Sequence, residues 1–180
     1  MKHVKLFVAL FAMLALGVGN AWGAEVTETA TFNSKSWGIA DGSNFSWTSG
    51  KDGNGFTNNQ GVQITTGVSG ANATTSKSFT NISKIEVTYC TNSKAGKGTI
   101  TLQVGTGTGQ SFSVSAPSKG GTTRKTTTFN YATPESGAVK LTVVCTTNSI
   151  YIYSITVTYE SGSTGTTLYL GQEMADPPPP

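Results

Sequence analysis

The sequence predicts an all-β fold, a two-sheet antiparallel β-sandwich of jelly-roll type with about ten strands. Apolar and polar residues alternate over short segments, which is the period of a strand with one buried face. No stretch carries apolar residues at the helical spacing of i, i+3 and i+4 over the length that a helix needs. Clusters of Gly, Asn, Ser and Thr separate the alternating segments, as turns do between strands.

The segments with strand character follow one another at short intervals along the chain. Turn sequences lie between them, such as DGSN at 41–44 and GTGTGQ at 105–110, whose residues tolerate positive φ or cap their own backbone. About ten such strands must each bury one face, which favours two packed layers or a barrel. The expected strands are 28–33, 44–48, 62–67, 75–79, 82–90, 98–105, 111–116, 124–131, 138–146 and 150–160.

An octet repeats within this pattern. Residues 82–89 read ISKIEVTY and residues 152–159 read IYSITVTY, so each copy places an Ile, a Val and a Tyr on one strand face. The residues that follow the two copies differ, TNSKAGKG after the first and SGSTG after the second. We therefore interpret the repeat as two strands with the same sequence pattern and not as a duplicated module.

The two ends of the chain differ from its middle. The first 24 residues have a basic start, an apolar run over 6–18 and the small-x-small sequence AWG, which together predict a secretory signal peptide. The expected domain is 25–160, in a protein that is secreted or held at the cell surface. We expect 161–180 to be a flexible linker that ends in a proline tail, with further domains of a longer parent chain left open.

Composition and charge exclude several functions. Removal of the signal peptide would take Lys2, Lys5 and the only histidine, His3, leaving ten basic and nine acidic residues. That balance gives no basic patch for nucleic acid. Without histidine, Ser-His-Asp and Cys-His catalysis are excluded and zinc loses its commonest nitrogen ligand. The acidic side chains fall mostly in polar turns and not in a facing pair, so we expect no enzyme activity.

The mature region holds two cysteines, Cys90 and Cys145. Export makes a disulfide chemically reasonable. Strand alternation places Cys90 outward with Glu86, and it places Cys145 inward with Val143. The sequence thus leaves open whether the two form a disulfide or remain separate thiols.

The order of segments resembles a known group of proteins. Trp47, GVQITTG, SKSFTNISKIEVTY, GTITLQVG, GAVKLTVV and IYIYSITVTY follow one another as in small β-sandwich modules of secreted proteins from gut-dwelling Gram-negative anaerobes. The resemblance covers about 44–160. Such modules look related in architecture to jelly-roll carbohydrate-binding modules of the galactose-binding-like type. The resemblance therefore implies binding of a sugar or a cell-surface glycan.

A sugar site needs a flat aromatic surface beside groups that hydrogen-bond hydroxyls. Trp37 lies among turn residues, while Trp47 alternates with Phe45 and is expected in the core. A pair of tyrosines in the last strand would form a second platform if it faces outward. The predicted ligand-binding residues are Trp37, Asp41, Asn44, Phe56, Asn58, Tyr151 and Tyr153. The alternative function is a structural or adhesive spacer that assembles through an unpaired sheet edge.

No cofactor is expected, although a structural calcium is left open. Asp52 and Asn54 are spaced like the start of a calcium loop, but its later ligands are missing. The resemblance implies calcium near the chain ends, where Glu25, Glu28 and Glu160 lie. The simpler interpretation is that these acidic side chains are solvated.

Overall fold

The computed structural model describes residues 24–38, 45–68, 70–92, 95–115 and 123–161. Strands predominate in this part of the chain, which confirms the all-β prediction. Within it, no helix is long and apolar enough to cross a membrane. The elements are β1 (Glu25–Thr31), β2 (Trp47–Lys51), β3 (Gly55–Thr57), β4 (Gly61–Thr65), the 3₁₀ turn η1 (Thr66–Val68), β5 (Ala71–Thr91), β6 (Lys97–Val104), β7 (Gln110–Ser115), β8 (Lys125–Thr147) and β9 (Ser149–Glu160).

Two long strands, β5 and β8, organise the fold. They pair antiparallel along most of their lengths, and their register shifts near residues 74–84. The sequence predicts each of them as two strands, because polar residues and a proline interrupt the alternation. In the structure these interruptions are irregularities within a continuous strand. Asn81 and Gly137 adopt positive φ values of 48° and 141°, and Pro134 lies between the paired positions Asn130 and Glu135.

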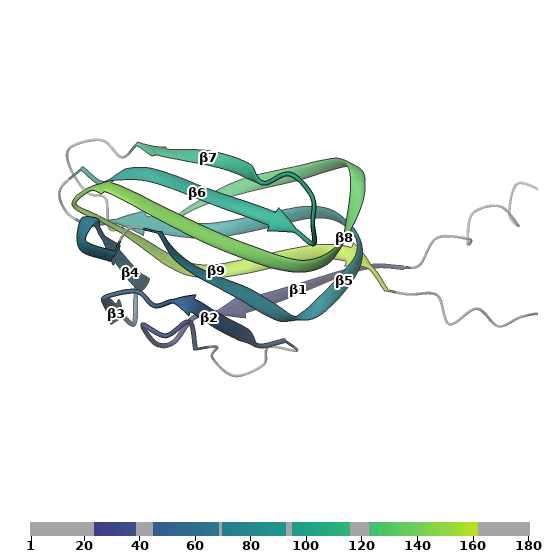
Figure 1. Ribbon diagram of the computed structural model, residues 1–180, viewed down its shortest axis with the longest axis horizontal. Coiled ribbons are helices and arrows are strands. Elements are labelled where there is room, and N and C mark those ends of the chain that lie inside the picture. The colour runs from purple at the N-terminus through teal and green to yellow at the C-terminus, as the bar shows by residue number, and fades with distance from the viewer. Residues whose placement is uncertain (1–23, 39–44, 69, 93–94, 116–122, 162–180) are drawn as a thin grey trace, which may run out of the picture. The chain divides into compact units, whose positions relative to one another are not determined.

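Hydrogen bonds join the strands into one sheet in the order β3-β4-β9-β5-β8-β6-β7, with β1 on β9 and β2 on β5. Because β5 and β8 bend, this sheet folds into two facing layers. The first layer holds β1, β3, β4 and β9 with the second half of β5 and the first half of β8. The second layer, in front in Figure 1, runs from β7 at the top through β6, β8 and β5 to β2 at the bottom.

The core lies between the layers, and the repeated octet contributes to it from two adjacent strands. Ile85 of β5 pairs with Val157 of β9, and Val87 pairs with Ile155, and all four side chains are fully buried. Tyr89 and Tyr159, which end the two copies, are also buried. The prediction that both copies are half-buried strands with Ile, Val and Tyr inward is confirmed. Pairing the two copies side by side builds the centre of the first layer.

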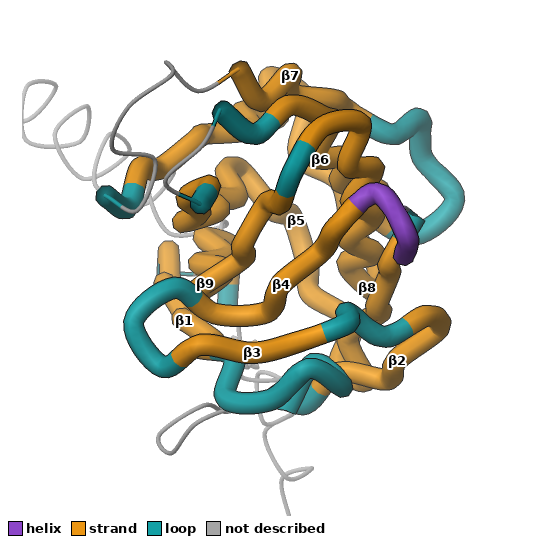
Figure 2. Tube along the Cα trace, turned by 90° about the vertical axis from the view of Figure 1, so that its left-hand side faces the viewer, coloured by secondary structure: helices purple, strands orange, loops and turns teal. Residues whose placement is uncertain are grey.

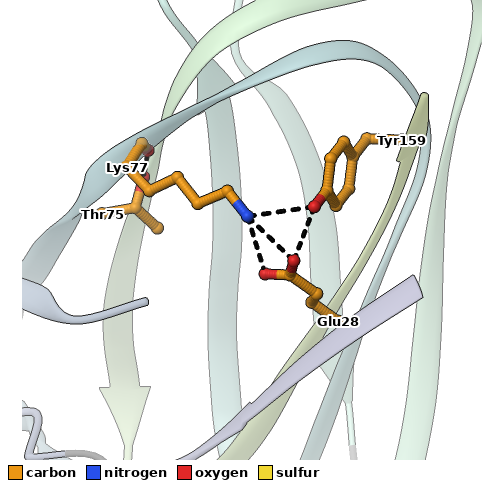
Figure 3. Close-up of polar contacts among 4 residues, drawn as sticks. All are labelled: Glu28, Thr75, Lys77 and Tyr159. Atoms are coloured by element: carbon orange, nitrogen blue, oxygen red, sulfur yellow. Dashed lines mark hydrogen bonds and ion pairs between the residues drawn. The ribbon is translucent and has the colours of Figure 1, made fainter. Parts of the chain in front are cut away.

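An ion pair closes one side of the sandwich (Figure 3). Glu28 of β1, opposite the core residue Val157, points inward and accepts from Lys77 Nζ of β5 at 2.8 and 3.0 Å. Tyr159 OH donates to Glu28 at 2.5 Å and accepts from Lys77 at 3.0 Å. Burial alone would raise the pKa of Glu28, but the hydrogen bonds from Lys77 and Tyr159 and the Lys77 charge leave that pKa lowered. Burial alone would lower the pKa of Lys77, and the same partners leave it raised.

The sequence prediction misses one strand. β3 has three residues and pairs with β4 across the turn at 57–60. Its neighbours are glycine and asparagine, which favour a loop prediction. Figure 2 views the molecule from the end where β3 and β4 lie, with the turn between them beside β9. This short hairpin positions polar side chains over the end of the first layer.

Candidate ligand-binding site

A β-bulge in β9 places one tyrosine on the outer face of the first layer. Ile152 pairs with Tyr89 of β5 and Ser154 with Thr88, so Tyr153 is an extra residue without a partner in that ladder. The partner of β9 also changes here, because its pairing with β4 extends to Ile152 and its pairing with β1 begins at Ser154. A bulge can re-aim a side chain and is common beside functional sites. The Tyr153 side chain is half-buried.

An arginine lies over this tyrosine. The Arg124 Cζ atom is 3.3 Å from the centroid of the Tyr153 ring, and Arg124 Nε donates to Asn59 O at 2.9 Å. Arg124 directly precedes β8, so its side chain crosses the outer face of β5 to reach β9. A planar guanidinium stacks on an aromatic ring and still presents N–H donors at its rim. The pair forms a small platform that is both flat and polar.

The turn at 57–60 borders the platform with amide side chains. Asn58 and Asn59 are exposed, and Gln60 is half-buried. Gln60 N donates to Thr57 O at 2.9 Å, which closes the turn. The next residue, Gly61, has φ of 99°, and a Cβ there would lie 2.0 Å from Ile152 O. Only glycine lets the hairpin come this close to β9.

Two buried side chains form the floor. Cys90 of β5 pairs with Tyr151 of β9, and the two are 2% and 7% exposed. Burial raises the pKa of the Cys90 thiol, against the opposing effects of a hydrogen bond from Gln60 and of the Arg124 charge. Burial also raises the pKa of Tyr151. We call Tyr151, Tyr153, Arg124 and the turn at 57–60 the Tyr153 platform.

The prediction that Trp37 is an exposed binding surface is wrong. Its side chain is 1% exposed, and its ring meets Phe32 edge to face at a centroid distance of 5.2 Å. The indole N–H donates to Lys51 O at 3.0 Å. Neighbouring turn residues suggest exposure in the sequence, but Trp37 has φ of 58° and its side chain joins the aromatic core. Trp47 is half-buried against the same core, as expected.

The other predicted residues are divided between the platform, a strand edge and the undescribed part of the chain. The structure brings Asn58, Tyr151 and Tyr153 together, with Tyr151 as floor and not as an exposed ring. Phe56 is half-buried in the edge strand β3. Asp41 and Asn44 lie outside the described residues, as do residues 1–23 of the predicted signal peptide and residues 162–180 of the predicted tail.

Sequence reasoning does not identify Arg124 as a site residue. Nothing around it in the chain marks it, because it lies at the start of an expected strand, far in sequence from both tyrosines. A signal does exist in the composition. The chain has few cationic side chains, and Arg124 is its only arginine. Only the order of strands, β9 beside β5 beside β8, brings it over Tyr153.

The two cysteines are both buried thiols and do not form a disulfide. Cys90 lies in the first layer beside Tyr151, and Cys145 lies in the second layer opposite Gly98 of β6. Cys90 lies on the outer face of β5, as predicted, but its side chain is buried because the platform covers it. Cys145 donates to Thr147 O and Asn148 O at 3.4 Å each.

The reactivity of the Cys90 and Cys145 thiols tests whether both are buried and unpaired with each other. Both thiols are about 2% exposed and burial raises the pKa of each, so we expect very slow reaction with Ellman's reagent near neutral pH. In urea without reductant, two thiols per chain should react rapidly. A disulfide would instead release no thiol in urea until a reductant was added.

Acidic side chains near the chain ends have protein partners. Glu25 and Glu160 are opposite each other on β1 and β9, and they accept from Ser83 Oγ at 3.0 Å and Asn81 Nδ2 at 2.7 Å. Glu28 is held by Lys77. Asp52 accepts from the hydroxyls of Ser36 and Ser49. No group of three metal-ligating side chains is found among the described residues, and the structural calcium stays an untested prediction.

Comparisons with known proteins add little to this geometry. No protein-family model matches the sequence, and no curated protein matches it significantly. Among solved structures, CBM35 from Cellvibrio japonicus Abf62 is similar, with 16% sequence identity, a TM-score of 0.38, and coverage of 77% of this chain and 95% of that chain. The resemblance to modules from gut-dwelling anaerobes stays a prediction.

Proposed function

We propose that this chain is a non-catalytic binding module that recognises carbohydrate, such as a glycan outside the cell or at its surface. The observation that carries the proposal is the β-bulge that turns Tyr153 outward beneath Arg124. A sugar ring has an apolar C–H face and a rim of hydroxyls, so it suits a flat surface bordered by hydrogen-bonding groups. The guanidinium and the turn amides supply those groups.

The arrangement of the platform suggests how a sugar would lie. The guanidinium lies over the centre of the Tyr153 ring, so a sugar would contact the outer plane of Arg124 and the edge of the ring. Asn58 and Asn59, both exposed, would reach hydroxyls at the rim. The nearby outer face carries threonines and serines, including Thr88 and Thr126, whose hydroxyls are 3.3 Å apart. Such surroundings suit a neutral polysaccharide.

Three of the described carboxylates have protein partners, which supports a non-catalytic function. Glu28 pairs with Lys77, and Glu86 lies 3.2 Å from Lys84. Asp52 accepts hydrogen bonds from two serine hydroxyls, those of Ser36 and Ser49. Hydrolysis of a glycosidic bond needs two carboxyl groups that flank the bond. We therefore assign the platform binding alone.

Substitution of Tyr153 by Ala should abolish most carbohydrate binding. The change removes the ring and leaves the Arg124 side chain without its support, so we expect affinity to fall at least about tenfold, roughly 1.4 kcal/mol. A glycan array would first identify a bound polysaccharide. Isothermal titration with that polysaccharide would then measure the loss. Arg124→Ala should weaken binding in the same assay, and Tyr153→Phe should largely retain it.

Thr101→Ala is the matched control, because Thr101 lies on the outer face of the other layer and bonds Ser111 at 2.8 Å. It should bind as tightly as the wild type. Equal affinity of wild type and Tyr153→Ala for the captured polysaccharide would remove the platform from the proposal. Failure of the folded protein to bind any glycan on the array would contradict carbohydrate recognition itself.

A further inference from the structure

The edges of a β-sheet carry unpaired backbone N–H and C=O groups, and proteins usually protect them. Most edges of this sandwich have such a device. β1 carries the inward-pointing Glu28, and β2 carries Lys51 and a register shift after Ser49. β3 is only three residues long. The edge half of β8 carries Lys125 and becomes irregular after Asn130.

β7 has none of these devices. Its sequence, QSFSVS, contains no charge and no proline. It pairs with β6 over six consecutive positions, from Gln110 with Leu102 to Ser115 with Lys97, and the register has no shift. Among the described strands, only β6 pairs with β7, and β7 forms the upper margin of the front layer in Figure 1. In a regular edge strand, alternate residues direct both backbone groups away from the sheet.

The side chains of β7 alternate by face. Ser111, Ser113 and Ser115 are exposed on the outer face, while Val114 is buried and Phe112 is half-buried against the core. Phe112 also meets Tyr89 of the other layer at a centroid distance of 5.7 Å. A strand added beside β7 would cover the remaining exposed surface of Phe112. It would meet only serines on the outer face, with no charge to repel it.

A second copy of β7 fits this edge by symmetry. Two copies of β7 in one antiparallel sheet would be related by a two-fold axis perpendicular to that sheet. Residues directly opposite each other point to the same face, so the register must place one residue opposite its own copy. Centred on Phe112, the pairing sets Ser111 opposite Ser113, with Phe112 opposite itself. Centred on Ser113, it sets Ser113 opposite itself, with Phe112 opposite Val114. The register centred on Ser113 matches apolar with apolar and serine with serine, whereas the register centred on Phe112 also sets Gln110 opposite Val114.

From this comparison of edges we infer that β7 is a self-association edge, through which two copies of the chain join their second layers into one continuous antiparallel sheet. The occupant is a second copy because the strand is complementary to itself in both length and polarity. Backbone hydrogen bonds give the attachment, and the Phe112 side chains give the apolar contact. The Tyr153 platform lies on the outer face of the other layer, so each copy keeps its own platform.

Charges placed on the serines test the inference. The acidic variant is Ser111→Glu with Ser113→Glu, and the basic variant is Ser111→Lys with Ser113→Lys. Like charges meet in either register, so each variant alone should lose the dimer. An equimolar mixture sets opposite charges across the edge and should recover the dimer mass. Sedimentation equilibrium over a range of concentrations, with the mature chain, measures all three samples and the wild type.

The control variant is Thr99→Lys with Thr101→Lys, which adds the same charge one strand inward and breaks the same Thr101–Ser111 hydrogen bond. It should dimerise like the wild type, and circular dichroism should show that all variants are folded. A wild type that stays monomeric at every soluble concentration would overturn the inference. A dimer that persists in both charged variants would assign association to another surface, and a mixture that stays monomeric would count equally against β7 pairing.

Discussion

Substitution of Trp37 by Ala is expected to lower the free energy of unfolding by about 4 kcal/mol, because the change empties a fully buried site. The indole is 1% exposed and packs edge to face on Phe32. The ring centroids of Phe32 and Trp47 are 5.5 Å apart, so a shift of Phe32 into the emptied site would also disturb this second aromatic contact. The hydrogen bond from the indole N–H to Lys51 O disappears as well. Urea unfolding followed by circular dichroism would measure the change.

Trp37→Phe separates packing from hydrogen bonding. It keeps an aromatic ring against Phe32 and removes only the indole donor and part of the volume, so we expect a loss of about 1–2 kcal/mol. Carbohydrate binding by folded Trp37→Phe should equal that of the wild type. Wild-type stability of Trp37→Ala together with loss of binding would show that the ring is a surface contact after all, contrary to its burial.

Substitution of Lys77 by Met should cost about 2–3 kcal/mol. The variant keeps most of the side-chain length but leaves the Glu28 carboxylate, whose side chain is 12% exposed, with only the Tyr159 hydroxyl. Removing one partner of a fully buried ion pair costs about 3–5 kcal/mol, and the smaller value reflects the 33% exposure of Lys77. Lys77 Nζ also lies 4.9 Å from the Tyr159 ring centroid, a contact that Met replaces without charge.

The loss should depend on pH. The pKa of Glu28 is lowered in the folded state, so its contribution is present above the ordinary glutamate pKa of about 4.3 and is lost as pH falls through the lowered value. The pKa of Lys77 is raised, so its contribution is present below the ordinary lysine pKa of about 10.4 and is lost as pH rises through the raised value. Between these limits, the stability difference between wild type and Lys77→Met should be flat.

A double-mutant cycle supplies the control for the ion pair. Glu28→Gln, Lys77→Met and the double variant are each unfolded in urea at neutral pH and at about pH 3. The coupling between the two side chains should be about 1–2 kcal/mol at neutral pH and should shrink in acid. A coupling that is zero at neutral pH, or one that grows in acid, would contradict the ion pair as a source of stability.

Local patterns in the sequence were sufficient to predict most of the strands. The alternation around Ile85, Val87, Ile155 and Val157 predicts which residues are buried, because a strand repeats every two residues whatever its neighbours are. The same rule fails where a strand bends. Asn81 and Pro134 look like ends of strands, yet β5 and β8 continue through them, since a bulge keeps the ladder on either side.

The candidate site could be predicted only in part. Tyr151 and Tyr153 attract attention because two aromatic residues share a face of the last strand, and Asn58 because it lies in a polar turn. Their meeting depends on which strands are neighbours. Arg124 reaches Tyr153 only because β8, β5 and β9 are adjacent in the first layer. Trp37 was misplaced because burial of a turn residue depends on the distant Phe32 and Lys51.

By itself, the sequence determined the all-β class, the inward face of most strands and the poverty of catalytic groups, because these depend on composition and on a two-residue period along the chain. The tertiary structure alone decided that four predicted strands are two, that Tyr153 lies under Arg124 and that β7 is left without the protection given to other edges. These features depend on strand order and register, which join residues far apart in the chain. Local alternation carries no information about either.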